Sequence, residues 1–236
     1  MAAASKSVVG KPVIDGVGWI PGGFVNMYSF REGDETYLID TGWSRKAKQI
    51  LRAFRDANVP PASVGKVLLT HHHLDHMGGA ACLREKMPAP LACHADDAPF
   101  VEGRAKARMP FLLRLFARVH PAPVTSVLKD GDQVGPLLVV HVPGHTPGEV
   151  AFYHPRRKLL FSGDSVVEHK GRFTMPAGKF ATSLPQAVQS LSRLRALDVD
   201  VVLPGHGVPV TKRVANLLDD LIQRAPAEFL GRPTGA

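Results

Sequence analysis

The stretch Thr70-His71-His72-His73-Leu74-Asp75-His76-Met77-Gly78-Gly79 contains an H-x-H-x-D-H pattern, formed by His71, His73, Asp75 and His76. The β-branched and apolar run Val64–Leu69 before it predicts a buried strand, and Gly78–Met87 after it predicts a helix. Imidazole nitrogens and carboxylates suit zinc, and also iron or manganese. The stretch therefore predicts four metal-competent side chains on a strand-to-helix turn of an α/β fold.

Three downstream motifs argue against the alternative of a solvated, His-rich turn. They are Pro-Gly-His-Thr-Pro-Gly with His145, Gly-Asp with Asp164, and Pro-Gly-His-Gly with His206. Each follows a predicted strand, and ligands gather at strand ends in layered α/β sheets. Seven candidate ligands are too many for one tetrahedral zinc, so the set suits two metal ions with one bridging carboxylate.

The remaining pattern predicts one domain over residues 1–236. A first edge strand is expected over Val13–Ile20, and Val25–Phe30 and Glu35–Asp40 are expected to form a hairpin. Helices are expected over Arg45–Ala57 with Ser44 as N-cap, over Pro185–Leu197, and from Thr211 to about Arg224. Further strands are expected over Leu91–His94, Val124–Leu128, Leu137–Val142, Glu149–His154, Lys158–Ser162 and Val199–Leu203.

Asp40 ends a predicted strand in Leu38-Ile39-Asp40-Thr41-Gly42. An Asp at such a turn often accepts hydrogen bonds from nearby backbone N–H groups. It could instead orient the metal ligands from behind. Sequence physics alone leaves both interpretations open.

The segment 104–119 mixes arginines and a lysine with apolar residues and is interrupted by Pro110. We interpret it as a helical insertion at about 100–120. It is either a lid, with Phe111, Leu112 and Phe116 against the substrate, or a helix docked on the domain or on a partner subunit in a homodimer. A membrane-surface role is a weaker alternative.

The formal net charge of +8 allows nucleic acid, a membrane surface or an anionic substrate as partner, or simply a basic solvated surface. Cys82 and Cys93 are the two cysteines, which favours a reduced, cytoplasmic setting over a disulfide scaffold. The first residues contain no apolar leader. No run approaches the roughly 20 apolar residues of a spanning helix.

Together these motifs closely resemble the metallo-β-lactamase-fold hydrolases from Asp40 to His206. The resemblance implies a four-layer αβ/βα sandwich with the site at one edge. It also implies that one metal is held by His71, His73 and His145, and the other by Asp75, His76 and His206. Asp164 would bridge the two metals, and Asp40 would support the site from behind.

The expected activity is that of a dinuclear metal-dependent hydrolase, with zinc as the expected metal and iron or manganese as alternatives. A water shared by two cations has a pKa lowered to about 7, which supplies a hydroxide at neutral pH. The expected substrate is a small ester, thioester, lactone or phosphoester, and Asp75 is the candidate to take or relay a proton. Arg172 could bind an anionic substrate group or could equally be a solvated loop charge.

Departures from known branches of the family narrow the prediction. The β-lactamases carry Cys or Ser where this chain has Asp164. Glyoxalase II enzymes have a Tyr just after the last His and a further C-terminal region, and homoserine-lactone lactonases have a Tyr where this chain has Val167. RNase Z-type nucleases share the ligand set, but no RNA-binding arm is recognisable, so a nucleic acid partner is not expected.

Persulfide dioxygenases are the main alternative, since they share the fold but use one iron held by two His and one Asp. Their short gap before the Asp is similar to His145–Asp164, and Gly171-Arg172-Phe173-Thr174 faintly resembles one of their motifs. A non-catalytic metal-binding protein is a third alternative, which the complete ligand set disfavours. The other histidines, His72, His94, His120, His141, His154 and His169, are expected to be ordinary surface or packing residues.

Overall fold

The computed structural model describes residues 8–106, 120–176 and 178–231. Within these ranges the first sheet has seven strands in sequence order: β1 Lys11–Ile14, β2 Val17–Pro21, β3 Asn26–Glu32, β4 Glu35–Ile39, β5 Val64–Leu68, β6 Leu91–His94 and β7 Ser126–Leu128. The pairs from β1 to β4 are antiparallel, whereas β4, β5, β6 and β7 run parallel. Parallel strands end at the same edge of a sheet, so the segments that follow β4, β5 and β6 come together there.

The second sheet has five strands among the described residues, in the order β14 Val201–Pro204, β11 Leu159–Gly163, β10 Val150–His154, β9 Leu137–His141 and β8 Gln133–Val134. β11 and β14 are parallel, and the other neighbours are antiparallel. A separate hairpin pairs β12 Val167–His169 with β13 Arg172–Thr174.

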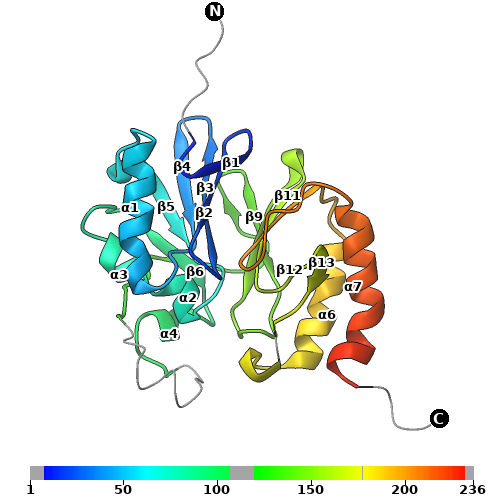
Figure 1. Cartoon of the computed structure of the whole chain (residues 1–236). Helices are drawn as coiled ribbons and strands as arrows, with labels where there is room; N and C mark the ends of the chain where they lie inside the picture. The colour runs from blue at the N-terminus through cyan, green and yellow to red at the C-terminus, as the bar shows by residue number, and fades with distance from the viewer. Residues whose placement is uncertain (1–7, 107–119, 177, 232–236) are drawn as a thin grey trace, which may run out of the picture.

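Helices cover the outer face of each sheet (Figure 1). On the first sheet these are α1 Ala47–Asp56, preceded by the 3-10 turn η1 Ser44–Lys46, and the short helices α2 Leu74–Met77, α3 Ala80–Leu83 and α4 Ala98–Val101. On the second sheet they are α6 Leu184–Arg195 and α7 Val214–Phe229. The 3-10 turns η2 Pro61–Ser63, η3 Pro155–Arg157 and η4 Gly178–Phe180 complete the described helical segments.

Three separate apolar cores hold these layers together. Ile50 and Phe54 of α1 pack in the core between the first sheet and its helices. Phe30 and Phe161, with ring centroids 5.8 Å apart, belong to the core between the two sheets. Leu191 of α6 lies in the core between the second sheet and its helices. Three cores between four layers give the αβ/βα sandwich that the sequence predicts.

Some element boundaries differ from those expected. Val13–Ile20 is not one strand, because the chain turns at Gly16, whose φ of +67° favours glycine, and forms β1 and β2. The helix expected over Gly78–Met87 is limited to α3, and no side chain caps η1 or α1. The last helix begins at Val214 rather than at Thr211 and continues through Pro226 to Phe229.

Most of the expected insertion at about 100–120 lies outside the described residues. This applies to the substrate contacts proposed for Phe111, Leu112 and Phe116, and to the choice between a lid and an interface helix. These stay predictions.

Candidate metal centre

The H-x-H-x-D-H segment leaves β5 and enters α2, which presents Asp75 and His76. Thr41, which follows β4, holds this segment in place. Its backbone N–H and its hydroxyl both donate to the carbonyl of His76, at 2.7 and 2.8 Å. Gly79 is required at this crossing, because a Cβ there would lie 2.3 Å from the carbonyl oxygen of Thr41.

The other ligands leave the second sheet. His145 follows β9 in a loop that packs on α6, where a Cβ on Gly144 would lie 2.1 Å from the backbone nitrogen of Ala187. Asp164 follows β11, and its backbone N–H donates to Glu149 Oε1 at 2.8 Å. His206 follows β14, and its Nδ1 forms a hydrogen bond with the carbonyl of Phe24.

All seven predicted ligands come together at the edge where the two sheets meet. In each of two groups the potential ligand atoms lie within 4.8 Å of one another: His71, His73 and His145, and Asp75, His76 and His206. We call these the three-histidine group and the Asp75 group.

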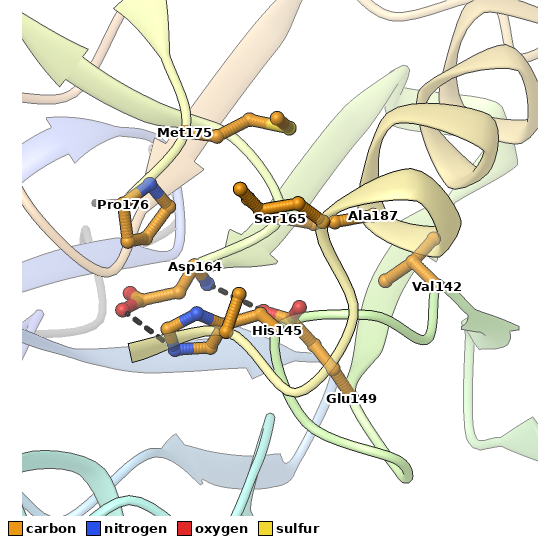
Figure 2. Close-up of a pocket in the computed structure, with 10 residues that line it drawn as sticks. Val142, His145, Glu149, Asp164, Ser165, Met175, Pro176 and Ala187 are labelled. Carbon is orange, nitrogen blue, oxygen red and sulfur yellow. Dashed lines mark hydrogen bonds and ion pairs between the residues drawn. The ribbon is translucent and has the colours of Figure 1, made fainter. Parts of the chain in front are cut away.

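Asp164 lies between the two groups. Its Oδ2 is 3.3 Å from the Nε2 atoms of both His145 and His206, and its Oδ1 is 3.3 Å from Nε2 of His76. Figure 2 shows the Asp164 carboxylate directed at the His145 ring. One carboxylate therefore faces ligands of both groups, which is the arrangement expected of a bridging ligand.

Charge and burial divide the histidines into two sets. Burial and neighbouring histidines hold the pKa values of His71 and His73 well below the usual range, so both rings are neutral. Burial opposes the charged form of His76 and His206 too, but the nearby carboxylates, Asp164 for both rings together with Asp40 at His76 and Asp75 at His206, outweigh it and raise the pKa of both. Asp164 is itself buried, yet His76 and His206 hold its pKa well below normal.

Several buried atoms at the site have no hydrogen-bond partner among the described residues. They are His71 Nε2, both ring nitrogens of His145, and Asp164 Oδ1. A buried polar atom without a partner costs about 1–3 kcal/mol. A metal ion bound by these lone pairs would offset that cost, and nitrogen with carboxylate oxygen is a donor set that suits zinc or iron. The residues present therefore fit a divalent metal.

Asp40 makes both kinds of contact considered from the sequence, one with the backbone and one with candidate ligands. Its Oδ1 accepts the backbone N–H of Thr70 at 2.8 Å. Its Oδ2 lies 2.8 Å from both the Thr70 hydroxyl and His76 Nδ1. Asp40 thus fixes the strand end and one ring orientation, and it reaches His71 through Thr70, whose Oγ1 is 3.0 Å from His71 Nδ1.

Arg172 contacts Asp220 of α7 at 3.2 Å with a side chain that is 61% exposed. This contact matches its interpretation as a surface charge, and binding of an anionic substrate group stays a prediction. The ring of His94 stacks on His141 at 4.0 Å and 14°, next to Asp96. In-plane lone pairs of stacked rings cannot meet at one ion, so we interpret this third cluster as packing.

Two buried acidic residues at the site escaped the sequence analysis. Asp97 is fully buried after β6 and accepts hydrogen bonds from both His-bearing loops. Glu149 is 1% exposed, and burial together with the charge of Asp164 raises its pKa well above the usual value. It borders a cavity of about 10 Å³ behind His145 and Asp164 (Figure 2), room for about one water molecule. The only local signal for Asp97 was an acid shortly after a strand end.

Comparisons with known proteins identify the family of this chain. The family model of the Metallo-beta-lactamase superfamily matches residues 20–206. The chain belongs to the metallo-beta-lactamase superfamily. No helix in the described part of this superfamily member is long and apolar enough to cross a membrane.

Relatives of this superfamily member include enzymes named as hydrolases. It is 27% identical over 184 residues to the probable metallo-hydrolase YybB of Bacillus subtilis, covering 78% of this chain and 80% of the relative. It is 31% identical over 176 residues to the hydroxyacylglutathione hydrolase of Hydrogenovibrio crunogenus. That match covers 72% of this chain but only 53% of the enzyme.

Solved structures give the same fold. TTHA1623 in a di-iron-bound form matches with a TM-score of 0.66 and 31% identity, covering 81% of this chain and 92% of that one. BJP-1, a subclass B3 metallo-beta-lactamase of Bradyrhizobium japonicum, matches with a TM-score of 0.75 over 98% of this chain and 97% of that one, at 19% identity. The second likeness concerns the fold alone.

Proposed function

We propose that this metallo-beta-lactamase superfamily member is a hydrolase that uses two divalent metal ions, with Zn²⁺ as the first candidate, on a small ester, thioester, lactone or phosphoester. The observation that carries the proposal is the position of Asp164 between two complete ligand groups, 3.3 Å from rings of both. A mononuclear site would not require the Asp75 group to be assembled so close to the three-histidine group.

The metals, when bound, would supply a water of lowered pKa and would polarise a substrate oxygen. In this proposal the three-histidine group would hold one ion and the Asp75 group the other, and Asp164 would be available to both. The chain's own catalytic group would be Asp75, whose Oδ2 lies 3.5 Å from His206 Nε2 and whose side chain is 24% exposed. Its partial exposure gives it access to solvent for proton transfer.

Exposed apolar side chains on the segments that carry the candidate ligands favour a substrate with an apolar part. Phe24 is 71% exposed while its carbonyl contacts His206, and Val208, two residues beyond His206, is 50% exposed. Phe180 is 39% exposed, shortly before Thr182, which donates to the carbonyl of His145. Exposed apolar residues on ligand-bearing segments favour a substrate with an acyl or alkyl group.

The relative named hydroxyacylglutathione hydrolase makes thioesters the first substrates to test, because hydroxyacylglutathiones are thioesters. The chain spans only about half of that enzyme, so glutathione recognition is not transferred with it. The two free cysteines, Cys82 and Cys93, support a reducing, cytoplasmic setting.

Elemental analysis of tag-free protein, purified without added metal, tests the proposal. About two zinc ions per chain, or mixed zinc, iron and manganese, followed by turnover in an ester, thioester and lactone panel, would support it. A single tightly held iron and oxygen consumption with glutathione persulfide would replace it with the dioxygenase interpretation.

A further inference from the structure

Asp97 lies between β6 and α4, and its carboxylate is completely buried. Both of its oxygens are used. Oδ2 accepts from the backbone N–H of His72 and from the hydroxyl of Thr146, each at 2.8 Å. Oδ1 accepts from the backbone N–H of Gly148 at 2.8 Å. The carboxylate thus connects two loops that lie far apart in the sequence.

The donors adjoin the proposed ligands without being ligands themselves. His72 lies between His71 and His73, and Thr146 directly follows His145. All three ligands of the three-histidine group are therefore within one residue of a hydrogen bond to the same carboxylate. Two of these donors are backbone N–H groups and the third is the hydroxyl of a short side chain, so none of them can move independently of its loop. Displacement of Asp97 would therefore displace the proposed ligands.

The surroundings are shaped for an anion at this position. His72 Nδ1 lies 3.0 Å from Asp97 Oδ2, and the His72 ring stacks on Phe100 of α4 at 4.2 Å and 13°. A Cβ on Gly148 would lie 2.8 Å from the Asp97 side chain, so the loop can approach this closely only with glycine. Although burial alone would raise the pKa of Asp97, the contacts with His72, Thr146 and Gly148 lower it, and the group is charged.

The Asp75 group is held by different residues. His76 Nδ1 contacts Asp40, and His206 Nδ1 contacts the carbonyl of Phe24. Asp40 also reaches His71 through Thr70, so it touches both groups. The Asp97 carboxylate instead accepts from His72, Thr146 and Gly148, which adjoin or closely follow the residues of the three-histidine group. Asp40 and Asp97 therefore differ in which group of candidate ligands they hold in place.

We propose that Asp97 is a positioning residue that selectively sets the affinity of the three-histidine group for its metal ion. The inference rests on the proposed dinuclear site. Partners that orient metal ligands typically contribute 10–100-fold to metal affinity. We therefore expect loss of this carboxylate to weaken one binding step by about that factor and to leave the other step within about threefold.

The test is a titration of metal-free protein with Zn²⁺ against a chromophoric chelator, which resolves the two binding steps. Asp97→Asn keeps the shape of the side chain but replaces one carboxylate oxygen, a hydrogen-bond acceptor, by an amide NH₂ group. That donor would face the N–H and O–H donors whose hydrogen bonds the carboxylate now accepts. Asp96→Asn is the matched control, because the neighbouring Asp96 side chain is 58% exposed and its carboxylate pairs with His94 at 3.6 Å rather than with His72 or Thr146. We expect Asp97→Asn to weaken one step selectively and Asp96→Asn to change neither.

Thr146 provides a test that does not depend on the folding of Asp97→Asn. Thr146→Val removes one of the donors to Asp97 at nearly constant shape, and Thr146→Ser restores the hydroxyl. We expect the valine variant to weaken the same single step and the serine variant to recover the affinity. Circular dichroism and urea unfolding of the metal-free variants establish that they are folded.

The outcomes separate this inference from the proposed function. Two zinc steps in the parent chain, with both steps kept or both weakened equally in folded Asp97→Asn and Thr146→Val, would overturn the positioning role alone. A parent chain that takes up no zinc or other divalent ion would overturn the dinuclear site and the inference with it.

Discussion

Gly205, immediately before His206, offers the sharpest test of the metal-centre geometry. A Cβ at this position would lie 2.6 Å from Asp164 Oδ1, 2.7 Å from His76 Cε1 and 2.9 Å from the carbonyl oxygen of Gly163. The backbone cannot move away, because the Gly205 N–H donates to Gly163 and its carbonyl accepts from Asn26, each at 2.8 Å. The methyl group of Gly205→Ala must therefore displace the Asp164 and His76 side chains.

The size of the effect follows from these distances. Normal contacts between non-bonded heavy atoms are about 3.5 Å, so Asp164 must shift by roughly 0.9 Å. A misplacement of about 1 Å in a catalytic site costs about 100-fold in rate. The overpacking should also lower the free energy of unfolding of the metal-free chain by about 1–3 kcal/mol.

We expect Gly205→Ala to retain about one metal ion per chain instead of two and to lose about 100-fold in hydrolysis of the best panel substrate. Gly65→Ala is the matched control, since a Cβ there meets only the Thr36 carbonyl oxygen at 3.7 Å. The control should keep its metal and activity and gain up to about 1 kcal/mol of stability. Full metal content and parental rate in Gly205→Ala would refute the proposed arrangement of His76 and Asp164.

Three further predictions follow from the same site. His73→Ala should lose one metal ion and Asp164→Ala should weaken both, as measured by elemental analysis; retained metal and activity in both variants would show that the ligand assignment is wrong. Acidification should release metal from the Asp75 group before the three-histidine group. The pKa values of His76 and His206 are raised and those of His71 and His73 are lowered, so protons displace metal from the first pair at a higher pH. Stepwise dialysis followed by metal analysis measures the order of release, and the opposite order would contradict the prediction. Removal of metal by a chelator should lower the thermal midpoint, since a ligand at 100 times its Kd adds about 2.7 kcal/mol, and calorimetry with and without added Zn²⁺ measures the difference.

The convergence of the seven candidate ligands could be predicted because each of them carries a local signature. His145 and His206 are each flanked by Gly and Pro after an apolar run, and Asp164 follows a strand that ends in Gly163. The fold then brings these side chains together, because the strands of the parallel pairs β4–β5 and β11–β14 end at the same edge of their sheet. Local chemistry and strand direction together were enough to place seven side chains in one site.

The buried acids could not be predicted in the same way. Asp97 contacts partners that are 25, 49 and 51 residues away, and no spacing rule connects them. Glu149 directly precedes β10, whose apolar sequence gives no sign of a buried acid. The break at Gly16 was missed because a single glycine interrupts an otherwise continuous pattern. The sequence predicts that the last helix ends before Pro226, because proline usually ends a helix. α7 nevertheless continues through Pro226, since a proline near a helix end removes only one hydrogen bond.

The acids and the ligands make opposite contributions to stability. Asp40, Asp97 and Glu149 each accept a backbone N–H that would otherwise be buried without a partner, so they stabilise the loops whether or not metal is bound. The imidazoles of His71 and His145 instead carry buried nitrogens without partners, which is a cost in the metal-free chain. The loops are therefore held in this arrangement by residues outside the predicted ligand set. This preorganisation lets the ligands converge on one point without relying on the ions for folding.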